Sequence, residues 1–331
     1  MTTAQDTFGP HSLEIDADRE VARISSMLTD YLRRARRRGG VVGLSGGIDS
    51  SAVAAVCVAA LGPGRVFGLH MPEIESSVDT LRFSRMLADS LGIESETVDI
   101  SSMLEAAACY RHRDDAIRLV EPNYGPGWKS KIVLPSVVDS DQFRIYSIVL
   151  LSPDGVESRH RLNPAAYLGI VAATNFKQRV RKMTEYYHAD RRNYVVAGTP
   201  NRLEYDQGFF VKLGDGSADV KPIAHLYKSQ VYQIAAHLGV PEQIRSRPST
   251  TDTYSLPQSQ EEFYFSLPYE RMDLCLYGYN NGVAVEEVAA ATSLTVDQVH
   301  RVIRDIDQKR RTTGYLHLAP VLVDPVTEIE A

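Results

Sequence analysis

Short apolar runs alternate with longer amphipathic segments along most of this chain. The spacing of apolar residues predicts strands at 41–44, 65–70, 96–100 and 194–197. It predicts helices at 14–38, 52–61, 78–91, 165–189 and 228–238, and the last of these is followed by Gly239 and Pro241 as stop signals. This alternation predicts an α/β fold with a doubly wound, Rossmann-like parallel sheet that has helices on both faces.

Residues 108–164 interrupt this rhythm. Five prolines with glycines between them fall in the segment, beside alternating stretches such as FRIYSIVLL. A structureless connection of that length is unusual, so we expect an inserted lobe or hairpin. The chain then divides into one domain made of residues 1–107 and 165–312, a lobe at 108–164 and a C-terminal tail at 313–331.

The most informative stretch is VVGLSGGIDSS, residues 41–51. A β-branched run ends in a glycine-rich turn, and a helix follows at once. Glycines let backbone N–H groups approach an anion, and a helix N-terminus adds a favourable dipole. Ser45, Ser50 and Ser51 offer hydroxyls to phosphate oxygens, and Asp49 can hold a divalent cation beside them. The lysine of a Walker A loop is absent, and the pattern resembles the pyrophosphate loop of enzymes that split ATP into AMP and pyrophosphate.

Bulk properties narrow the class of protein. The chain has 331 residues, 44% of them apolar, and a formal net charge of −6, which argues against a protein that coats nucleic acid. We find neither a secretory leader pattern nor an apolar run long enough to span a bilayer. Three scattered cysteines form no disulfide framework or zinc pattern, and they fit a cytoplasmic location.

Several families of such enzymes share this loop, and a second block distinguishes between them: GTPNRLEYDQGFFVKLGDGSADVKPIAHLYKSQ at 198–230. It resembles the corresponding block of ammonia-dependent NAD synthetases, which are ATP pyrophosphatases with an adenine nucleotide alpha hydrolase-like fold. The segments NFKQRVRKM at 175–183 and LGVPEQI at 238–244 share this resemblance. It covers residues 14–105 and 165–312, with the lobe outside it.

The resemblance implies roles for individual residues. The catalytic residues would be Asp49, Glu204 and Lys228, with Asp49 and Glu204 holding Mg²⁺. The ATP-binding set would comprise Ser45, Gly46, Gly47, Ile48, Asp49, Ser50, Ser51, Thr199, Lys228 and Ser249, with Thr250 as the alternative to Ser249. The acid-binding set would comprise Asn175, Arg179, Lys212, Asp219, Gln308 and Lys309. Gln308 replaces the histidine of the family's His-Lys pair, and Asp215 is interpreted as a turn residue.

These roles imply a reaction. The carboxylate of deamido-NAD would attack the α-phosphorus of ATP, pyrophosphate would leave, and ammonia would convert the acyl-adenylate to NAD and AMP. No glutaminase domain fits in the matched regions, so free ammonia is the expected donor, although a separate glutaminase partner stays open. The family pairs through the 165–189 region, which implies a homodimer. Apolar positions at Tyr167, Ile170, Val171, Thr174, Val180, Met183 and Tyr187 fit helix packing there.

Two other functions stay open at this point. An AMP-forming amide ligase acting on a different carboxylic acid is favoured by the lobe and by Gln308. A tRNA-modifying ATP pyrophosphatase shares the loop, but the acidic net charge and the GFFVKLGDGSAD block argue against it.

Overall fold

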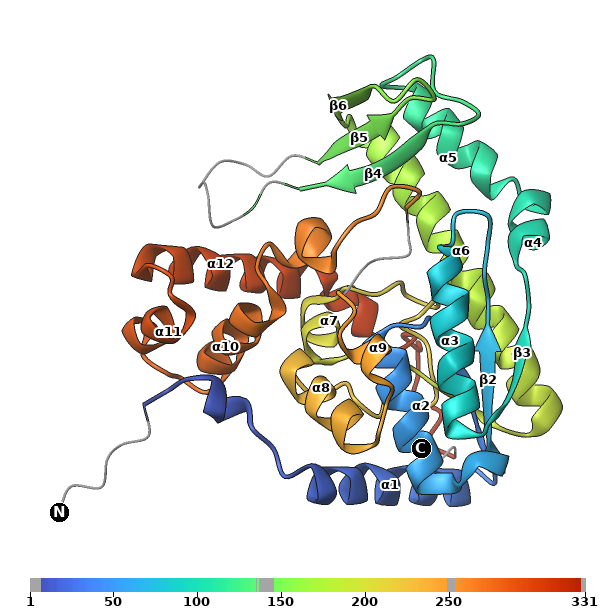
Figure 1. The fold of residues 1–331 in the computed structure, drawn as a ribbon, viewed down its shortest axis with the longest axis vertical. Helices are drawn as coiled ribbons and strands as arrows, with labels where there is room; N and C mark the ends of the chain where they lie inside the picture. The colour runs from blue at the N-terminus through green and yellow to red at the C-terminus, as the bar shows by residue number, and fades with distance from the viewer. Residues whose placement is uncertain (1–6, 135, 137–145, 249–253, 329–331) are drawn as a thin grey trace.

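A four-stranded parallel sheet organises most of the fold, and Figure 1 labels two of its strands, β2 and β3. The computed structural model describes residues 7–134, 136, 146–248 and 254–328. The strand order is β3–β2–β1–β7, with bounds Glu94–Thr97, Val66–His70, Gly40–Gly43 and Val195–Ala197 respectively. Helices cover both faces of this sheet, which confirms the predicted doubly wound α/β fold.

The described helices follow the predicted order along most of the chain. Those of the first half are α1 (Ala17–Arg34), α2 (Ile48–Leu61), α3 (Val78–Leu91), α4 (Ser101–Ala106), α5 (Cys109–Arg118) and α6 (Pro164–Arg192). Those of the second half are α7 (Arg202–Gln207), α8 (Lys228–His237), α9 (Glu242–Arg245), α10 (Tyr269–Asn280), α11 (Val285–Thr292) and α12 (Val296–Thr313). In the described ranges, none of the helices combines the length and the apolar content needed to cross a bilayer.

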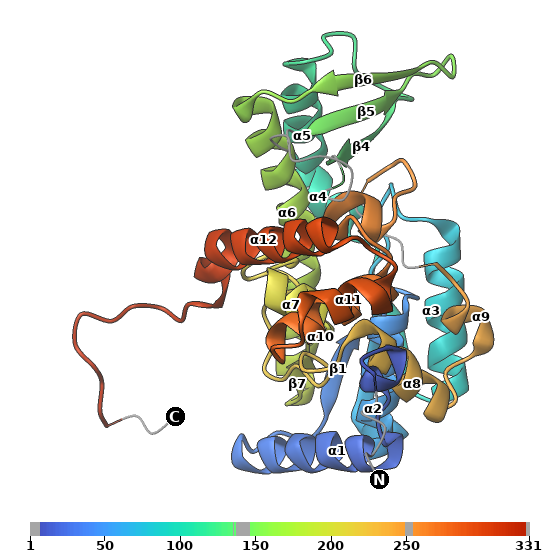
Figure 2. The same cartoon turned by 90° about the vertical axis from the view of Figure 1, so that its left-hand side faces the viewer.

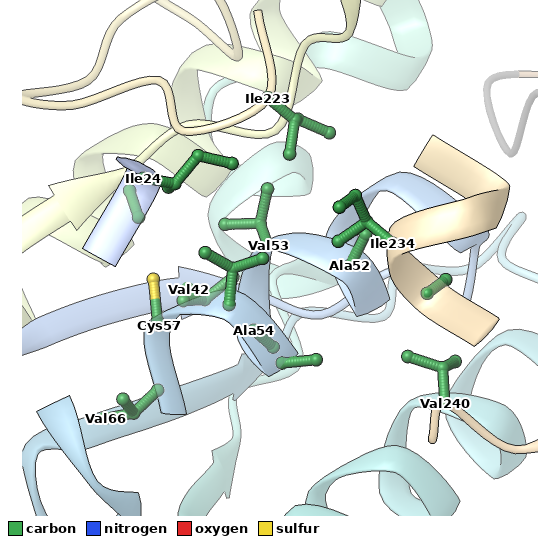
Figure 3. Close-up of a cluster of buried hydrophobic side chains, with 14 of the residues drawn as sticks. Ile24, Val42, Ala52, Val53, Ala54, Cys57, Val66, Ile223, Ile234 and Val240 are labelled. Carbon is green, nitrogen blue, oxygen red and sulfur yellow. The ribbon is translucent and has the colours of Figure 1, made fainter. Parts of the chain in front are cut away.

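Alternate residues of β1 supply the two sides of the core. Val42 lies in a cluster with Val53 of α2 and Ile234 of α8 (Figure 3). Val41 belongs to a cluster with Phe67 and with Ala189 of α6. Successive side chains of a strand point to opposite faces of the sheet, so each face receives its own helix layer. Helix α2 is apolar on almost every side because α1, α8 and the sheet enclose it.

Three expectations about element boundaries were wrong. Helix α1 is shorter than predicted, because the chain leaves it at Arg34 and Arg36 takes a left-handed φ of 52°. Helix α2 starts at Ile48 rather than at residue 52, so the polar end of the loop forms its first turn. Strand β3 lies at Glu94–Thr97 rather than at 96–100, since the apolar residues Val98 and Ile100 pack after the strand has ended.

Residues 108–164 contain α5 and a separate antiparallel sheet. Strands β4 (Lys129–Val133), β5 (Ser147–Leu151) and β6 (Glu157–Arg161) pair in the order β4–β5–β6. Their apolar face packs with α5 and with the first turns of α6. Figure 2 shows this lobe above the parallel sheet, with α6 running from one to the other.

A buried ion-pair network ties the lobe to the chain that follows β2. Lys177 of α6 is 3% exposed, and its Nζ lies 3.0 Å from Oε1 of Glu73 and also contacts Glu75. Glu75 in turn pairs with Arg113 of α5. Breaking one partner of such a buried set leaves an uncompensated charge, so the network favours one placement of α5 against the loop after β2.

The C-terminal part forms a third cluster and a tail. Helices α10, α11 and α12 pack around Met272, Val299 and Ile306. After α12, the turn Gly314–His317 lies against the body, and residues 318–328 follow without helix or strand. Val323 in this tail is 100% exposed.

We predict that Ile234→Ala will destabilise the fold strongly. Ile234 is fully buried between α8 and α2, and its loss leaves a cavity where the helix layer meets the sheet (Figure 3). The free energy of unfolding, measured by urea denaturation, should fall by about 2–5 kcal/mol. Met27→Ala on α1, where the side chain is 40% exposed, is the control and should change it by about 0.5 kcal/mol or less. If Ile234→Ala lowers the free energy of unfolding by less than the control does, the contact between α8 and α2 is not a packed core.

Candidate active site

The glycine-rich loop joins the end of β1 to the first turn of α2. Gly46 has φ of +69°, and a Cβ placed on it would lie 2.7 Å from the carbonyl oxygen of Thr80 in α3. Both facts require glycine at this position. Gly47 is the N-cap of α2, so the free backbone N–H groups of that helix face the loop and form a setting for an anion.

The three loop serines divide into two kinds. The hydroxyls of Ser45 and Ser50 lie 3.0 Å apart and line a cavity. Ser51 is fully buried, and its hydroxyl donates to the carbonyl oxygen of Gly47 at 2.8 Å. Ser45 and Ser50 therefore line the space for a ligand, and Ser50 and Ser51 both hold the first turn of α2 through the carbonyl oxygen of Gly47.

Asp49, Glu204 and Lys228 come together although they are far apart in sequence. The Nζ atom of Lys228 pairs with Oδ2 of Asp49. The side-chain amide of Asn201 donates to Oδ1 of Asp49 at 3.0 Å, so both oxygens of this carboxylate have a partner. The backbone N–H of Asn201 donates to Oε2 of Glu204 at 3.2 Å, which places the two carboxylates on either side of one asparagine.

Local sequence explains how each of these side chains is held. Asn201 and Glu204 form a capping box at the start of α7, in which Oδ1 of Asn201 accepts from the N–H of Glu204 at 3.2 Å. Lys228 is the first residue of α8, and its N–H donates to Asp273 of α10 at 3.1 Å. Both helix starts are thus fixed before any ligand binds.

Burial and mutual charge shift the titration of this cluster. Burial and the charge of Asp49 raise the pKa of Glu204 to about 8. Burial alone would lower the pKa of Lys228, but the carboxylates of Asp49 and Glu204 outweigh it and raise that pKa above its usual value. Lys228 therefore stays an ammonium at neutral pH. Glu204 is mostly protonated at neutral pH, and a cation placed beside it would lower its pKa and favour the carboxylate.

One cavity of about 1140 Å³ joins the loop to α6 and α12. A site for a single small molecule usually has about 300–1,000 Å³, so this cavity lies above the upper end of that range. The expected site residues that line it are Ser45, Gly47, Ile48, Asp49, Ser50, Asn175, Arg179, Thr199, Glu204, Lys212, Lys228, Gln308 and Lys309. Ser249 and its alternative Thr250 lie outside the described residues.

The lining of the cavity also includes the basic residues expected to bind an acid. Nε of the exposed Arg179 donates to the carbonyl oxygen of Lys212 at 3.3 Å. Nζ of Lys212 donates to the carbonyl oxygen of Tyr315 at 2.8 Å and lies over the Tyr315 ring. The turn after α12 therefore forms part of the cavity wall beside Lys212.

Three of the expected residues are placed differently from their expected roles. Gly46 and Ser51 do not line the cavity, since both are buried within the loop and α2. Asp219 is exposed and away from the cavity, and its carboxylate accepts from the N–H of Val196 in β7 at 2.7 Å. As placed here, Asp219 braces the sheet edge instead of facing an acid substrate.

Lys309, an expected site residue, and Asp215, which was interpreted as a turn residue, both line the cavity and have largely internal contacts. Nζ of Lys309 contacts Asp305 at 2.7 Å and the carbonyl oxygen of Tyr264 at 2.8 Å. Asp215 accepts from the N–H of Val211 at 2.8 Å, as expected for a turn residue, and it also lines the cavity.

The sequence analysis missed two polar residues at the centre of the site. Asn201 stands three residues before Glu204, so the N-x-x-E spacing of a capping box was a usable signal. Gln260 donates from its amide to Oε1 of Glu204 at 3.0 Å, and no local pattern indicates this contact.

The donor set fits Mg²⁺ better than a transition metal. In the described part of the chain, no three His, Cys, Asp or Glu side chains gather as a metal cluster. Two neighbouring carboxylates, Asp49 and Glu204, are a typical protein contribution to a Mg²⁺ ion whose other ligands are phosphate oxygens and water.

Comparison with known proteins gives one consistent result. The family model for NAD synthase matches residues 20–134 and 137–313, and this match runs through most of the 108–164 lobe, which we had expected to lie outside it. An NH₃-dependent NAD⁺ synthetase of Rhizobium meliloti is 58% identical over 323 residues, 98% of this chain and 97% of the relative. One of Mesorhizobium japonicum is 59% identical over 311 residues, 94% of this chain and 98% of the relative.

Solved structures agree on the fold. The NH₃-dependent NAD synthetase of Campylobacter jejuni superposes with a TM-score of 0.61 at 20% identity, covering 94% of this chain and all of that one. The loop, the acidic pair and these matches lead to one conclusion: the chain belongs to the NAD synthase family.

Proposed function

We propose that this protein is an ammonia-dependent NAD synthetase, which adenylates deamido-NAD with ATP and transfers ammonia to give NAD, AMP and pyrophosphate. The observation that carries the proposal is the single cavity in which the glycine-rich loop and the Arg179–Lys212 pair face a common space. A reaction between two nucleotides needs such a space, and relatives that are 58% identical bear this name.

ATP fits the end of the cavity at the loop. The N–H groups at the start of α2 and the hydroxyls of Ser45 and Ser50 suit the β- and γ-phosphates. Lys228 supplies a positive charge beside them, and Thr199 lines the same wall. These donors stabilise the charge that pyrophosphate gains as it leaves.

Asp49 and Glu204 would hold Mg²⁺. When bound, the ion neutralises phosphate charge and orients the reacting oxygens. Asn201 keeps the two carboxylates in place, because it bonds to both of them.

Deamido-NAD fits the part of the cavity that is lined by Arg179 and Lys212. Arg179 and Lys212 offer cationic donors for a pyrophosphate or a carboxylate, and Asn175 and Gln308 add neutral ones. Neither half-reaction needs a side-chain nucleophile, so the chain mainly positions the reactants.

Ammonia is the proposed nitrogen donor. A glutaminase would need a reactive nucleophile, and the three cysteines do not supply one. Burial raises the pKa of Cys57 and of Cys275 to about 12, and it raises that of Cys109 too. All three thiols are buried and stay protonated at neutral pH, in keeping with the proposed cytoplasmic location.

We also propose a homodimer built on α6. Four large apolar side chains of this helix are exposed: Leu168 (63%), Phe176 (36%), Met183 (60%) and Tyr187 (61%). Their spacings of eight, seven and four residues put them on one face of the helix. Of the other positions noted in the sequence, Tyr167, Ile170, Val171 and Val180 pack in the chain's own core, and Thr174 is half-buried and lines the cavity.

The first prediction concerns products and metal. With deamido-NAD and ammonium, ATP should give AMP and pyrophosphate in equal amounts. Asp49→Ala removes a cation ligand and a partner of Lys228, so kcat/KM should fall by ~100-fold or more, about 3 kcal/mol. Asp30→Ala on the exposed face of α1 is the matched control. Near-normal turnover of Asp49→Ala at saturating Mg²⁺ would refute the loop assignment.

The second prediction concerns the acid. Arg179→Ala should raise the KM for deamido-NAD by roughly 10-fold or more, because it removes a charge-assisted contact. The KM for ATP should stay within about 2-fold, since Arg179 contacts the backbone of Lys212 and is not among the residues proposed to hold ATP. Arg191→Ala, near the end of the same helix, serves as control. If only another carboxylic acid supports pyrophosphate release, the protein is an amide ligase of different specificity.

The third prediction concerns assembly. Met183→Asp puts a charge in the middle of the proposed contact face, and burying it unpaired is costly. Wild type should elute as a dimer at micromolar concentration, and the variant should shift towards monomer. Met27→Asp on α1 should leave the mass unchanged. A monomeric wild type would contradict the proposal.

A further inference from the structure

Residues 254–260 form a segment that we call the strap, and it lies against the lobe. The N–H of Leu256 donates to the carbonyl oxygen of Ser130 in β4 at 3.2 Å. The N–H of Ser130 donates to Oγ of Ser255 at 2.8 Å. These bonds join residues that are more than 120 positions apart, so the strap follows the edge of the lobe sheet formed by β4.

Gln258 makes the most buried of these contacts. Its side chain is 2% exposed, and its Nε2 donates to the carbonyl oxygen of Ile132 at 2.6 Å. Ile132 is itself in the lobe core, with 1% exposure. Because both residues are buried, water cannot replace this hydrogen bond between Gln258 and Ile132.

Two residues further along, the strap reaches the active site. Nε2 of Gln260 donates to Oε1 of Glu204 at 3.0 Å. The other carboxylate oxygen, Oε2, accepts from the N–H of Asn201. Each oxygen keeps a second lone pair, so Glu204 can be oriented by these donors and still bind a cation.

We propose that the lobe anchors the strap so that Gln260 acts as a positioning residue for Glu204. The lobe thereby contributes to cation and ATP binding without touching either. This inference rests on the proposed role of Glu204 as a ligand of Mg²⁺.

The contacts favour this function over a purely structural one. Gln260 lines the cavity beside Glu204, and its partner is a carboxylate that the fold already satisfies at the other oxygen. Hydrogen-bond partners of metal ligands fix the ligand orientation, and replacing one typically weakens metal binding or activity by about 10–100-fold. A strap anchored only for stability would need no amide at this position.

The test compares two substitutions that remove an amide and keep the length of the side chain. Gln260→Met loses the donor to Glu204, and Gln258→Met loosens the strap from β4. The readout is binding of Mn²⁺ in the presence of ATP, followed by the electron paramagnetic resonance signal of free Mn²⁺. Both variants should bind Mn²⁺ roughly 10-fold more weakly than wild type.

Kinetics and coupling give a second readout. In both variants kcat should fall by roughly 10-fold, while the KM for deamido-NAD stays within about 2-fold. The double variant should match the single ones, because both act through the same contact. Arg159→Ala, exposed on β6 at the far edge of the lobe sheet, should leave every readout unchanged.

Several results would overturn the inference. If Gln260→Met binds Mn²⁺ as tightly as wild type does, Gln260 is not a positioning residue for Glu204. If the losses of Mn²⁺ affinity add up in the double variant, Gln258 and Gln260 do not act through the same contact. If Gln258→Met changes only the thermal unfolding midpoint, the lobe does not contribute to cation binding. If wild type binds Mn²⁺ and ATP but does not convert deamido-NAD, the proposed substrate is wrong, and the Mn²⁺ measurements still decide the role of Gln260.

Discussion

The carboxylate of Asp49 and the ammonium of Lys228 pair in a buried space beyond the carboxyl ends of the strands, and their attraction is the interaction on which the site depends. Lys228 is 1% exposed, and an ammonium buried that deeply without a partner would be very costly. Asp49 supplies the opposite charge, and Asn201 satisfies the remaining oxygen. Because removing any member leaves a buried charge or an unmet donor, the three elements that carry them are held in one arrangement.

The fold brings these groups together through the starts of helices. Asp49 is the second residue of α2, Glu204 the third of α7 and Lys228 the first of α8. In a parallel α/β sheet, such starts gather beyond the carboxyl ends of the strands, where ligands bind. The positive dipole ends of these helices, together with the N–H groups at the start of α2, then face the same cavity and favour anions. The same arrangement of helix starts therefore pairs Asp49 with Lys228 and favours the binding of phosphate.

Local signals predicted most of the fold and many of the residues that the structure brings together at the candidate site. The glycine-rich loop, Glu204 and Lys228 could be identified because each lies in a compact motif. Strand β3 was misplaced because its residues ESET are all exposed and carry no apolar signal. Gln260 and the bracing role of Asp219 depend on contacts between segments distant in sequence, which no local pattern encodes. The left-handed Arg36 that ends α1 early is likewise set by its surroundings.

The position of β1 in the sheet has a consequence for the order in which the molecule forms. Gly40 pairs with Val66 on one side and with Val195 on the other. The second of these pairings spans the lobe and the whole of α6, and contacts so distant in sequence form slowly. During synthesis, the half-finished sheet has an unpaired edge on β1 until the chain has passed residue 197. Asp49 emerges early in this process, but it meets Lys228 only after more than two thirds of the chain has been made.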